Sequence, residues 1–274
     1  DFFGGIAARI AGIKKVIWNV RYSDVELGKT KILTIFIMKI LVYLSFLIPK
    51  SIIINSKRGM RIYATKGYDK KKLILIQNGF DLSILKINKT KNKNFRKKIK
   101  IKKETPLIGN VSRYDPKKDH SNLIQALSLL KSKKINFFCV LVGTKIHKYN
   151  LELISKIQEL KLIKNIKLLG RSNNITEVMN GIDIFVQSSS YGEGFPNVVA
   201  ESMACGTPCV ATDVGDARII IGDTGWIVPP KNPHKLAKAI ETAINEIKTK
   251  KKSKISYKAR LRIKKNFEIK KMIN

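Results

Sequence analysis

The stretch Ser188–Gly215, SSSYGEGFPNVVAESMACGTPCVATDVG, constrains the fold more than any other part of this chain. It follows Asp183–Gln187 (DIFVQ), an apolar run whose length favours one buried strand. Pro196 suits the first turn of a helix, and Gly206 suits the residue just past its end. The segment PCVAT then predicts a second buried strand. A strand, a Gly-rich loop, a helix N-terminus and another strand form an arrangement that holds an anion or a polyol.

Two carboxylates give this stretch its predicted chemistry. Glu193 lies in the loop and Glu201 in the helix, with seven residues between them. A carboxylate only accepts hydrogen bonds, and its two oxygens suit a pair of neighbouring hydroxyls. The two residues could therefore hold two diols, one on a sugar ring and one on a ribose. The alternative is a pair of surface glutamates near a helix start, which the helix dipole favours. The intervening GFPN favours the binding site.

The segments EGFPNVVAE and CGTPCVATDVG resemble the retaining glycosyltransferases of family 4, which have the GT-B fold. The resemblance implies that Glu193 contacts the donor sugar and takes part in catalysis. It implies that Glu201 contacts the ribose of the nucleotide. The residues between them, whose backbone is expected to face the sugar hydroxyls and the diphosphate, are Gly194, Phe195, Pro196 and Asn197.

A second predicted part of the site follows the strand Pro106–Val111, in the segment SRYDPKKDH. Open α/β sheets bind their ligands at the carboxyl ends of their strands. Two cations there would neutralise a diphosphate as it leaves. Arg113 and Lys118 match the R-x4-K pattern of the family, and the resemblance assigns them to the donor diphosphate. Asp119 is expected to cap the next helix, and His120 is interpreted as structural.

Further along, Gly170 and Arg171 follow the predicted strand Ile166–Leu169. The resemblance implies that these two residues approach the nucleotide base. No Asp-x-Asp cluster stands at a strand end, and the histidines are scattered. The prediction is therefore a site without a metal and an enzyme without a cofactor, whose co-substrate is the nucleotide-diphosphate sugar.

The predicted fold class is α/β of the GT-B type, with two Rossmann-like domains, parallel sheets and an incomplete N-terminal domain. The chain starts without a Met or a signal peptide. The resemblance places the first strands, a Gly-rich loop and a family histidine upstream of Asp1, so an inactive fragment that keeps donor binding is one alternative. The predicted divisions are 1–85, part of the acceptor-side domain; 86–105, a basic linker; 106–250, the nucleotide-sugar domain; and 251–274, a basic C-terminal helix.

The most apolar stretch is Thr30–Ile48, which Pro49 ends. It falls short of the roughly 20 uninterrupted apolar residues that a spanning helix needs. We expect a helix packed on the domain or, alternatively, one lying on an anionic membrane surface beside its lysines. Its polar residues are expected on one side of the helix: Lys31, Thr34, Lys39 and Ser45.

The formal charge of +34 is typical of proteins that bind nucleic acid, anionic membranes or anionic substrates. The excess is mostly Lys and accompanies abundant Ile and Asn, residues with A/T-rich codons, so much of it is nucleotide bias on solvated faces. The run Lys86–Lys103 has Phe95 as its one aromatic side chain, whereas nucleic-acid stacking needs several. We interpret it as a solvated linker, with a basic contact surface as the alternative.

The predicted function is transfer of a sugar, with retention, from a nucleotide-diphosphate sugar to a glycan or polyprenyl-linked acceptor in cell-surface polysaccharide or glycolipid synthesis. A nucleotide-sugar epimerase is the enzyme alternative, and it would need an acid and base pair that the sequence does not place. A basic nucleic-acid-binding protein is the alternative from another class. The three cysteines lack regular spacing, which indicates a reducing compartment. The predicted location is cytoplasmic, and peripheral on the inner face of the plasma membrane; nucleic acid is not an expected partner.

Overall fold

The computed structural model describes residues 2–21, 32–249 and 252–273, and the chain divides into two compact units. Unit 1 comprises Asp1–Asn78 and the short loop Gly192–Phe195. Unit 2 comprises Gly79–Tyr191 and Pro196–Asn274. Both contain parallel sheets with helices, so the predicted α/β class with two Rossmann-like domains is confirmed.

Unit 1 is built on a three-stranded parallel sheet of order β1-β2-β3. Its core gathers around Trp18, Ile52 and Tyr63, which are all buried. Ser56 begins α3 as predicted, because its hydroxyl accepts a hydrogen bond from the Gly59 amide at 3.0 Å. The elements are α1 (Phe2–Ile10), β1 (Ile17–Val20), α2 (Ile32–Leu47), β2 (Ser51–Ile54), α3 (Lys57–Thr65), a 3-10 turn (Lys70–Lys72) and β3 (Leu73–Leu75).

Unit 2 is built on a six-stranded parallel sheet of order β6-β5-β4-β7-β8-β9. Its strands are β4 (Leu107–Val111), β5 (Phe138–Val142), β6 (Ile166–Leu168), β7 (Ile184–Gln187), β8 (Cys209–Thr212) and β9 (Trp226–Val228). Its helices are α4 (Lys89–Ile99), α5 (His120–Ser132), α6 (Leu151–Glu159), α7 (Ile175–Gly181), α8 (Asn197–Ala204), α9 (Ala217–Ile221), α10 (Pro233–Lys248), α11 (Lys252–Phe267) and α12 (Lys270–Ile273), with a 3-10 turn at Pro116–Lys118.

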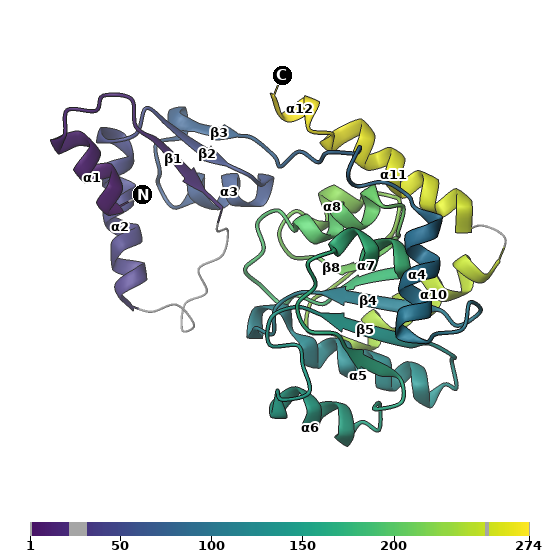
Figure 1. Cartoon of the computed structure of the whole chain (residues 1–274). Coiled ribbons are helices and arrows are strands. Elements are labelled where there is room, and N and C mark those ends of the chain that lie inside the picture. The colour runs from purple at the N-terminus through teal and green to yellow at the C-terminus, as the bar shows by residue number, and fades with distance from the viewer. Residues whose placement is uncertain (1, 22–31, 250–251, 274) are drawn as a thin grey trace. The chain divides into compact units, whose positions relative to one another are not determined.

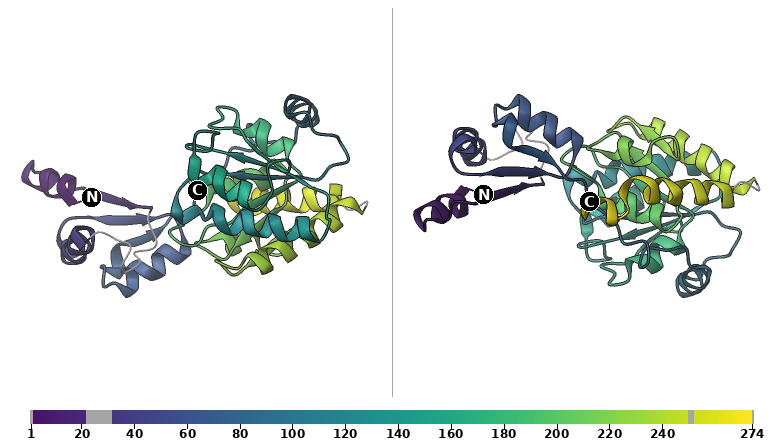
Figure 2. Two further views of the ribbon diagram at one scale, coloured as in Figure 1. Left: turned by 90° about the horizontal axis from the view of Figure 1, so that it is seen from below. Right: turned by 90° about the horizontal axis from the view of Figure 1, so that it is seen from above.

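Helices cover both faces of this sheet (Figure 1). The paired helices α5 and α10 lie on one face, and α4, α7 and α8 lie on the other, an arrangement that the two further views also show (Figure 2). Strands β4, β7 and β8 are buried at every residue, as parallel strands covered on both sides must be. One large hydrophobic core lies between the sheet and the α5–α10 pair.

The strand order contains one reversal, and it fixes where a ligand can bind. From β4 the chain proceeds to β5 and β6 on one side, then returns to add β7, β8 and β9 on the other. In open α/β sheets the loops that leave two such strands diverge, and they open a crevice at the carboxyl edge. The crevice that this topology predicts for unit 2 lies beyond the ends of β4 and β7.

The segment 86–105, predicted as a solvated basic linker, contains the helix α4 instead. Asn88 caps the helix, with its side-chain oxygen accepting from the Lys91 amide at 2.9 Å. Phe95 and Ile99 are buried although lysines surround them, and α4 packs on α7. The prediction was wrong because two apolar residues one helical turn apart are too few to give a recognisable period.

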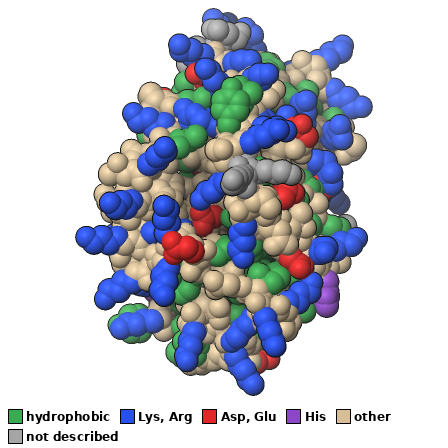
Figure 3. All heavy atoms as spheres, turned by 90° about the vertical axis from the view of Figure 1, so that its right-hand side faces the viewer, with side chains coloured by type: hydrophobic (Ala, Val, Ile, Leu, Met, Phe, Trp, Pro, Cys, Tyr) green, Lys and Arg blue, Asp and Glu red, His purple; other side chains and the backbone are tan. Residues whose placement is uncertain are grey.

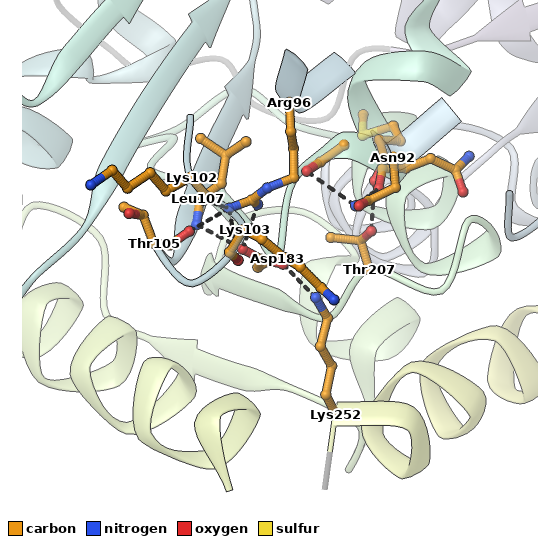
Figure 4. A network of polar contacts seen from close by, with 12 residues as sticks. Asn92, Arg96, Lys102, Lys103, Thr105, Leu107, Asp183, Thr207 and Lys252 are labelled. Atoms are coloured by element: carbon orange, nitrogen blue, oxygen red, sulfur yellow. Dashed lines mark hydrogen bonds and ion pairs between the residues drawn. The ribbon is translucent and has the colours of Figure 1, made fainter. Parts of the chain in front are cut away.

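A buried ion pair attaches α4 to the sheet at the amino end of β7 (Figure 4). Arg96 lies 3.0 Å from the Asp183 carboxylate, which also accepts from the Leu107 amide at 2.8 Å. Lys252, at the start of α11, pairs with the other oxygen of Asp183. Both partners of the central pair are nearly inaccessible, so loss of either one would leave an uncompensated charge. This network lies at the edge of the sheet opposite the crevice.

The division between the units falls at Asn78 rather than at residue 85. The residues that follow pair with the C-terminal helices of unit 2. The Phe80 amide donates to the Phe267 carbonyl at 2.8 Å, and the Ile269 amide donates to the Phe80 carbonyl at 3.0 Å. Arg260 of α11 donates to the carbonyls of Leu82 and Leu85.

The apolar stretch predicted at Thr30–Ile48 forms α2, and Thr30 and Lys31 lie outside the described residues. One side of α2 packs on the unit 1 core, as the packed alternative expected. Ser45 does not lie with an outward polar side: it is buried, donates to the Val42 carbonyl at 2.6 Å and accepts from the Asp69 amide at 3.0 Å. Within the described ranges, no helix has the length and hydropathy to cross a membrane.

Candidate functional site

The loop after β4 presents the first pair of predicted site residues. Arg113 is largely exposed, and its Nε lies 3.1 Å from the Asp115 carboxylate. The other carboxylate oxygen of Asp115 accepts from the Lys117 amide at 3.0 Å and caps the 3-10 turn that ends at Lys118. Asp115 therefore orients the guanidinium through Nε, and the two terminal nitrogens of Arg113 have no hydrogen-bond or ion-pair partner within the described part of the chain. Such a pair of nitrogens suits two oxygens of a phosphate.

Serines at the end of β7 bind this loop to the central stretch. The Ser188 hydroxyl donates to the Lys118 carbonyl at 2.8 Å, and the Ser190 amide donates to the Lys117 carbonyl at 2.8 Å. The Thr212 hydroxyl at the end of β8 donates to the Ser189 carbonyl at 2.6 Å. The loop after β4 is thus hydrogen-bonded, through the carbonyls of Lys117 and Lys118, to the start of the segment that follows β7.

The loops after β5 and β6 join the same edge through two glycines. Gly143 has φ +151°, and a Cβ there would lie 2.0 Å from the Ser112 carbonyl oxygen, so the position requires glycine. The Gly143 amide donates to the Gly170 carbonyl at 2.8 Å, and the Gly170 amide donates to the Ile146 carbonyl at 2.7 Å. Gly170 therefore lies at the carboxyl edge, as predicted. Arg171 lines a separate cavity beside α4 and α7 that no residue of the β4 or β7 loops lines.

The helix α8 carries Glu201, the residue predicted to bind the ribose. Pro196 is its N-cap, without a capping side-chain hydrogen bond, and Asn197 is its first residue and is exposed. The helix ends at Ala204, and Gly206 follows with φ +78°, in agreement with the expected stop. Arg260 donates to the Ala204 carbonyl and so neutralises this helix end.

Glu201 lies in the second turn of α8 and is partly buried. Among the described residues its carboxylate has no hydrogen-bond or ion-pair partner, and burial raises its pKa. A partly buried carboxylate without a partner costs free energy in the empty protein. Ligand hydroxyls that donate to it would recover part of that cost.

The E-x7-E pair is divided between the two units. Gly192–Phe195, and with it Glu193, Gly194 and Phe195, groups with unit 1, whereas Pro196, Asn197 and Glu201 belong to unit 2. Gly194 and Phe195 are buried. The two carboxylates therefore belong to different units. Arg113, Lys118, Gly170 and Glu201 remain together in unit 2.

His120 agrees with its structural interpretation. It is buried at the start of α5, its Nε2 lies 3.1 Å from the Ser112 hydroxyl, and that hydroxyl donates to Asn110. Burial, with a smaller contribution from Lys118, lowers the pKa of His120 to about 4. The imidazole is therefore neutral at physiological pH. It connects the end of β4 to the helix that follows.

The sequence did not identify three residues that shape the site. Asp115 lies in the predicted loop segment SRYDPKKDH, and Ser188 and Ser190 begin the central stretch, but the sequence predicts no role for these three side chains. Their signal was present, because three successive serines follow a buried strand at the edge where ligands bind. Their partners are backbone carbonyls of a loop about 70 residues away, and no sequence pattern specifies such pairing.

The described residues contain no cluster of three or more His, Cys, Asp or Glu side chains that could hold a metal ion. The three cysteines are free and buried, and burial raises the pKa of Cys205 to about 11 and that of Cys209 to about 12. They are thus protonated core residues. Lysines and arginines are spread over the face in Figure 3 and do not form one stripe.

The model of the family "Glycosyl transferases group 1" matches residues 91–262. A Campylobacter jejuni relative, N-acetylgalactosamine-N,N'-diacetylbacillosaminyl-diphospho-undecaprenol 4-alpha-N-acetylgalactosaminyltransferase, is 34% identical over 156 residues, which are 56% of this chain and 41% of that protein. The Escherichia coli UDP-Gal:alpha-D-GlcNAc-diphosphoundecaprenol alpha-1,3-galactosyltransferase is 23% identical over 80% of this chain and 56% of its own. The chain therefore spans about half or less of the curated relatives that it matches.

Solved structures agree with the fold. The crystal structure of Anabaena Alr3699/HepE in complex with UDP-glucose aligns with a TM-score of 0.86 and 25% identity, and the alignment covers 98% of this chain and 72% of that one. WaaG, a glycosyltransferase involved in lipopolysaccharide biosynthesis, aligns with a TM-score of 0.73 over 94% of this chain and 76% of its own at 16% identity, which shows the fold alone. Since the family model covers more than half of the chain, the protein belongs to the glycosyl transferases group 1 family and has the GT-B fold.

Proposed function

We propose that the protein transfers a sugar from a nucleotide-diphosphate sugar to a glycan or lipid-linked acceptor, with retention of the anomeric configuration. The observation that carries the proposal is the pair of loops at the reversal point of the unit 2 sheet. Ser188 and Ser190 hold the Arg113–Lys118 loop beside the segment that leads to α8. Arg113, Lys118 and the Glu201 carboxylate, which has no partner among the described residues, thus belong to the same edge of unit 2.

Each residue of this edge has a role in the proposal. Arg113 and Lys118 bind the donor diphosphate and stabilise its charge as the bond between the sugar carbon and the phosphate oxygen breaks. Glu201 accepts from the ribose hydroxyls. Glu193 accepts from hydroxyls of the transferred sugar, and the backbone of Gly194–Asn197 faces sugar and diphosphate. Gly170 approaches the base, whereas Arg171, which the resemblance also assigned to the base, lines the separate cavity beside α4 and α7. The acceptor hydroxyl attacks the sugar carbon from the face that the diphosphate leaves and gives its proton to the departing phosphate oxygen, which yields retention.

The proposed reaction uses no metal, since two side-chain cations and the amino end of α8 supply positive charge around the diphosphate. The names of similar proteins support the substrate classes. One is a complex with UDP-glucose, and two act on sugars attached to diphospho-undecaprenol. UDP and UDP-sugars are therefore the first ligands to test.

Isothermal titration calorimetry with UDP tests the donor site directly. Each charge-assisted contact to phosphate is worth roughly 1.5–3 kcal/mol, so Arg113→Ala should weaken UDP binding at least tenfold. Lys97→Ala, which removes an exposed charge from α4, is the matched control and should leave the affinity unchanged. Unchanged UDP affinity in Arg113→Ala would remove this residue from the site.

We also propose that unit 1 rests on the anionic inner face of the plasma membrane, which would locate the protein in the cytoplasm. The outer side of α2 exposes large apolar side chains, and a polar one, Lys39, is exposed among them. Those with the most exposure are Ile32 at 85%, Tyr43 at 75% and Leu47 at 72%. Apolar side chains beside cations are what an interfacial helix presents to anionic lipid.

Flotation with vesicles tests this attachment. The chain should rise with vesicles that contain anionic phospholipid, and less in high salt, because salt screens the attraction between lysines and headgroups. A Phe36→Ser, Phe46→Ser double variant, which removes two more exposed apolar side chains of α2, should rise less. Protein that remains at the bottom of the gradient with anionic vesicles would contradict the proposal.

A further inference from the structure

A cavity of about 450 Å³ lies in unit 2, away from the β4 and β7 loops. Residues of α4, β6, the loop after β6 and the start of α7 line it. Its volume falls within the range of small-molecule sites. Since Arg113, Lys118 and Glu201 do not line the cavity, it is separate from the proposed diphosphate and ribose contacts.

The lining combines an apolar wall with unpaired positive charge. Phe95, Ile99 and Val178 are buried residues that supply apolar surface. Lys98 and Arg171 form no ion pair or hydrogen bond within the part of the chain that the structure describes. Lys167, the third cation, has only a long contact of 3.5 Å from its Nζ to the Ile99 carbonyl.

The charge balance of the cavity favours an anion. Three cations line it against one carboxylate, that of Glu177, and none of the four makes an ion pair within 4.0 Å among the described residues. Cations brought together without counterions repel one another, and an anion that binds between them removes this repulsion. A phosphate monoester, with close to two negative charges at neutral pH, matches this excess.

The remaining polar residues of the lining favour a hydroxylated ring on that phosphate. Ser172, Asn173 and Asn174 come from one loop and offer hydroxyl and amide groups; the Asn174 side-chain oxygen already accepts from the Glu177 amide at 3.1 Å, so this residue offers its NH2 group. Amide side chains both donate and accept, which suits sugar hydroxyls, and the apolar wall suits the C–H face of a pyranose. We propose that this cavity is a second ligand site, distinct from the donor site, that binds a hexose phosphate.

Titration of glucose 1-phosphate into the 274-residue chain saturated with UDP tests the site, because UDP blocks the donor edge. Binding should persist in UDP and should fall at least tenfold in the Lys98→Ala, Lys167→Ala double variant, as two charge-assisted contacts are lost. Lys97→Ala is the matched control: it lies next to Lys98 in α4 but does not line the cavity, and its affinity should equal that of the wild type. The melting temperatures of the free variants should be within a few degrees of the wild type, which confirms folding.

Three results would overturn the site. They are no binding to the UDP-saturated wild type, equal binding by the double variant, or competition between UDP and glucose 1-phosphate, which would assign the cavity to the donor site. Inorganic phosphate should bind at least tenfold more weakly than glucose 1-phosphate, and equal affinity would refute the hexose part. Arg113→Ala should lose UDP and keep glucose 1-phosphate, so failure of the donor site and failure of this site give different results.

Discussion

The burial of the helices α2 and α4 is the opposite of what their compositions suggest. The helix α4 reads KTKNKNFRKKI, yet Phe95, Arg96 and Ile99 are buried and it packs on α7. The helix α2 reads ILTIFIMKILVYLSFL, yet the one residue it buries fully is Ser45. The basic helix α4 thus contributes side chains to a core, whereas the apolar helix α2 exposes much of its surface.

The difference shows that a few well-placed residues decide what a helix does. Phe95 fits so closely against α7 that a Cβ on Gly181 would lie 2.1 Å from its ring. Lys89, Lys93 and Lys97 of α4 are exposed and leave their charge in water, whereas Lys91 donates to the Thr176 hydroxyl of α7 at 2.6 Å. In α2 no comparable contact from the described residues covers the outer side, whose apolar side chains are exposed.

The largest expected effect comes from Phe95→Ala. Loss of a buried phenyl ring should destabilise unit 2 by about 3–5 kcal/mol, because the cavity that remains cannot close against the rigid α4–α7 contact. Urea unfolding measures this change. The comparison predicts that Phe36→Ala in α2, where the ring is 59% exposed, changes stability by no more than about 0.5 kcal/mol. Equal losses in the two variants would refute the contrast between the helices.

Much of the fold could be predicted from the sequence, because local signals and the family pattern agreed. The strand that ends at Gln187, the helix that ends before Gly206 and the cap at Asp119 are observed. The helix α4 could not be predicted, since it is held by Phe95 against α7 and by Arg96 against Asp183, a residue 87 positions away. Local propensity contains no information about such a partner.

The site could be predicted less completely than the fold. Patterns identified Arg113, Lys118, Gly170 and Glu201, which all lie in unit 2 near strand ends or on α8. The roles of these residues remain predictions. Asp115, Ser188 and Ser190 were not identified, because their contribution is to hold two loops together through backbone groups. Only the three-dimensional structure pairs those groups.

A second prediction concerns two histidines: His120, which is buried, and His234, which is exposed. His120 has a pKa of about 4 in the folded chain and about 6.5 when unfolded. A lowered pKa stabilises the fold above pH 6.5, and this contribution is lost as the pH falls toward 4. The loss should be about 3 kcal/mol.

Urea unfolding between pH 7 and pH 4 measures the effect. In His120→Gln the free energy of unfolding should fall by about 3 kcal/mol less between pH 7 and pH 4 than in the wild type. In His234→Gln, at an exposed position, the free energy of unfolding should depend on pH as it does in the wild type. A wild-type slope in His120→Gln would show that folding does not lower the pKa of this histidine.

The smallest expected effect concerns the outer side of α2. The Phe36→Ser, Phe46→Ser double variant should unfold within about 0.5 kcal/mol of the wild type, because both rings are mostly exposed in the fold. Thermal and urea unfolding check this. A loss of several kcal/mol would mean that these rings are covered in solution, and that the comparison underestimates the burial of α2.

The most direct test of the central claim, a donor site divided into sugar and nucleotide parts, is calorimetry of UDP and UDP-glucose on two matched variants. Glu201→Gln keeps the shape and removes charge-assisted acceptance from hydroxyls, so both ligands should bind at least tenfold more weakly. Without ligand, this variant should be more stable at neutral pH, because burial raises the pKa of Glu201 and so penalises its charged form. Glu193→Gln should bind UDP as the wild type does and lose affinity only for UDP-glucose. Equal loss of UDP in both variants would contradict the division.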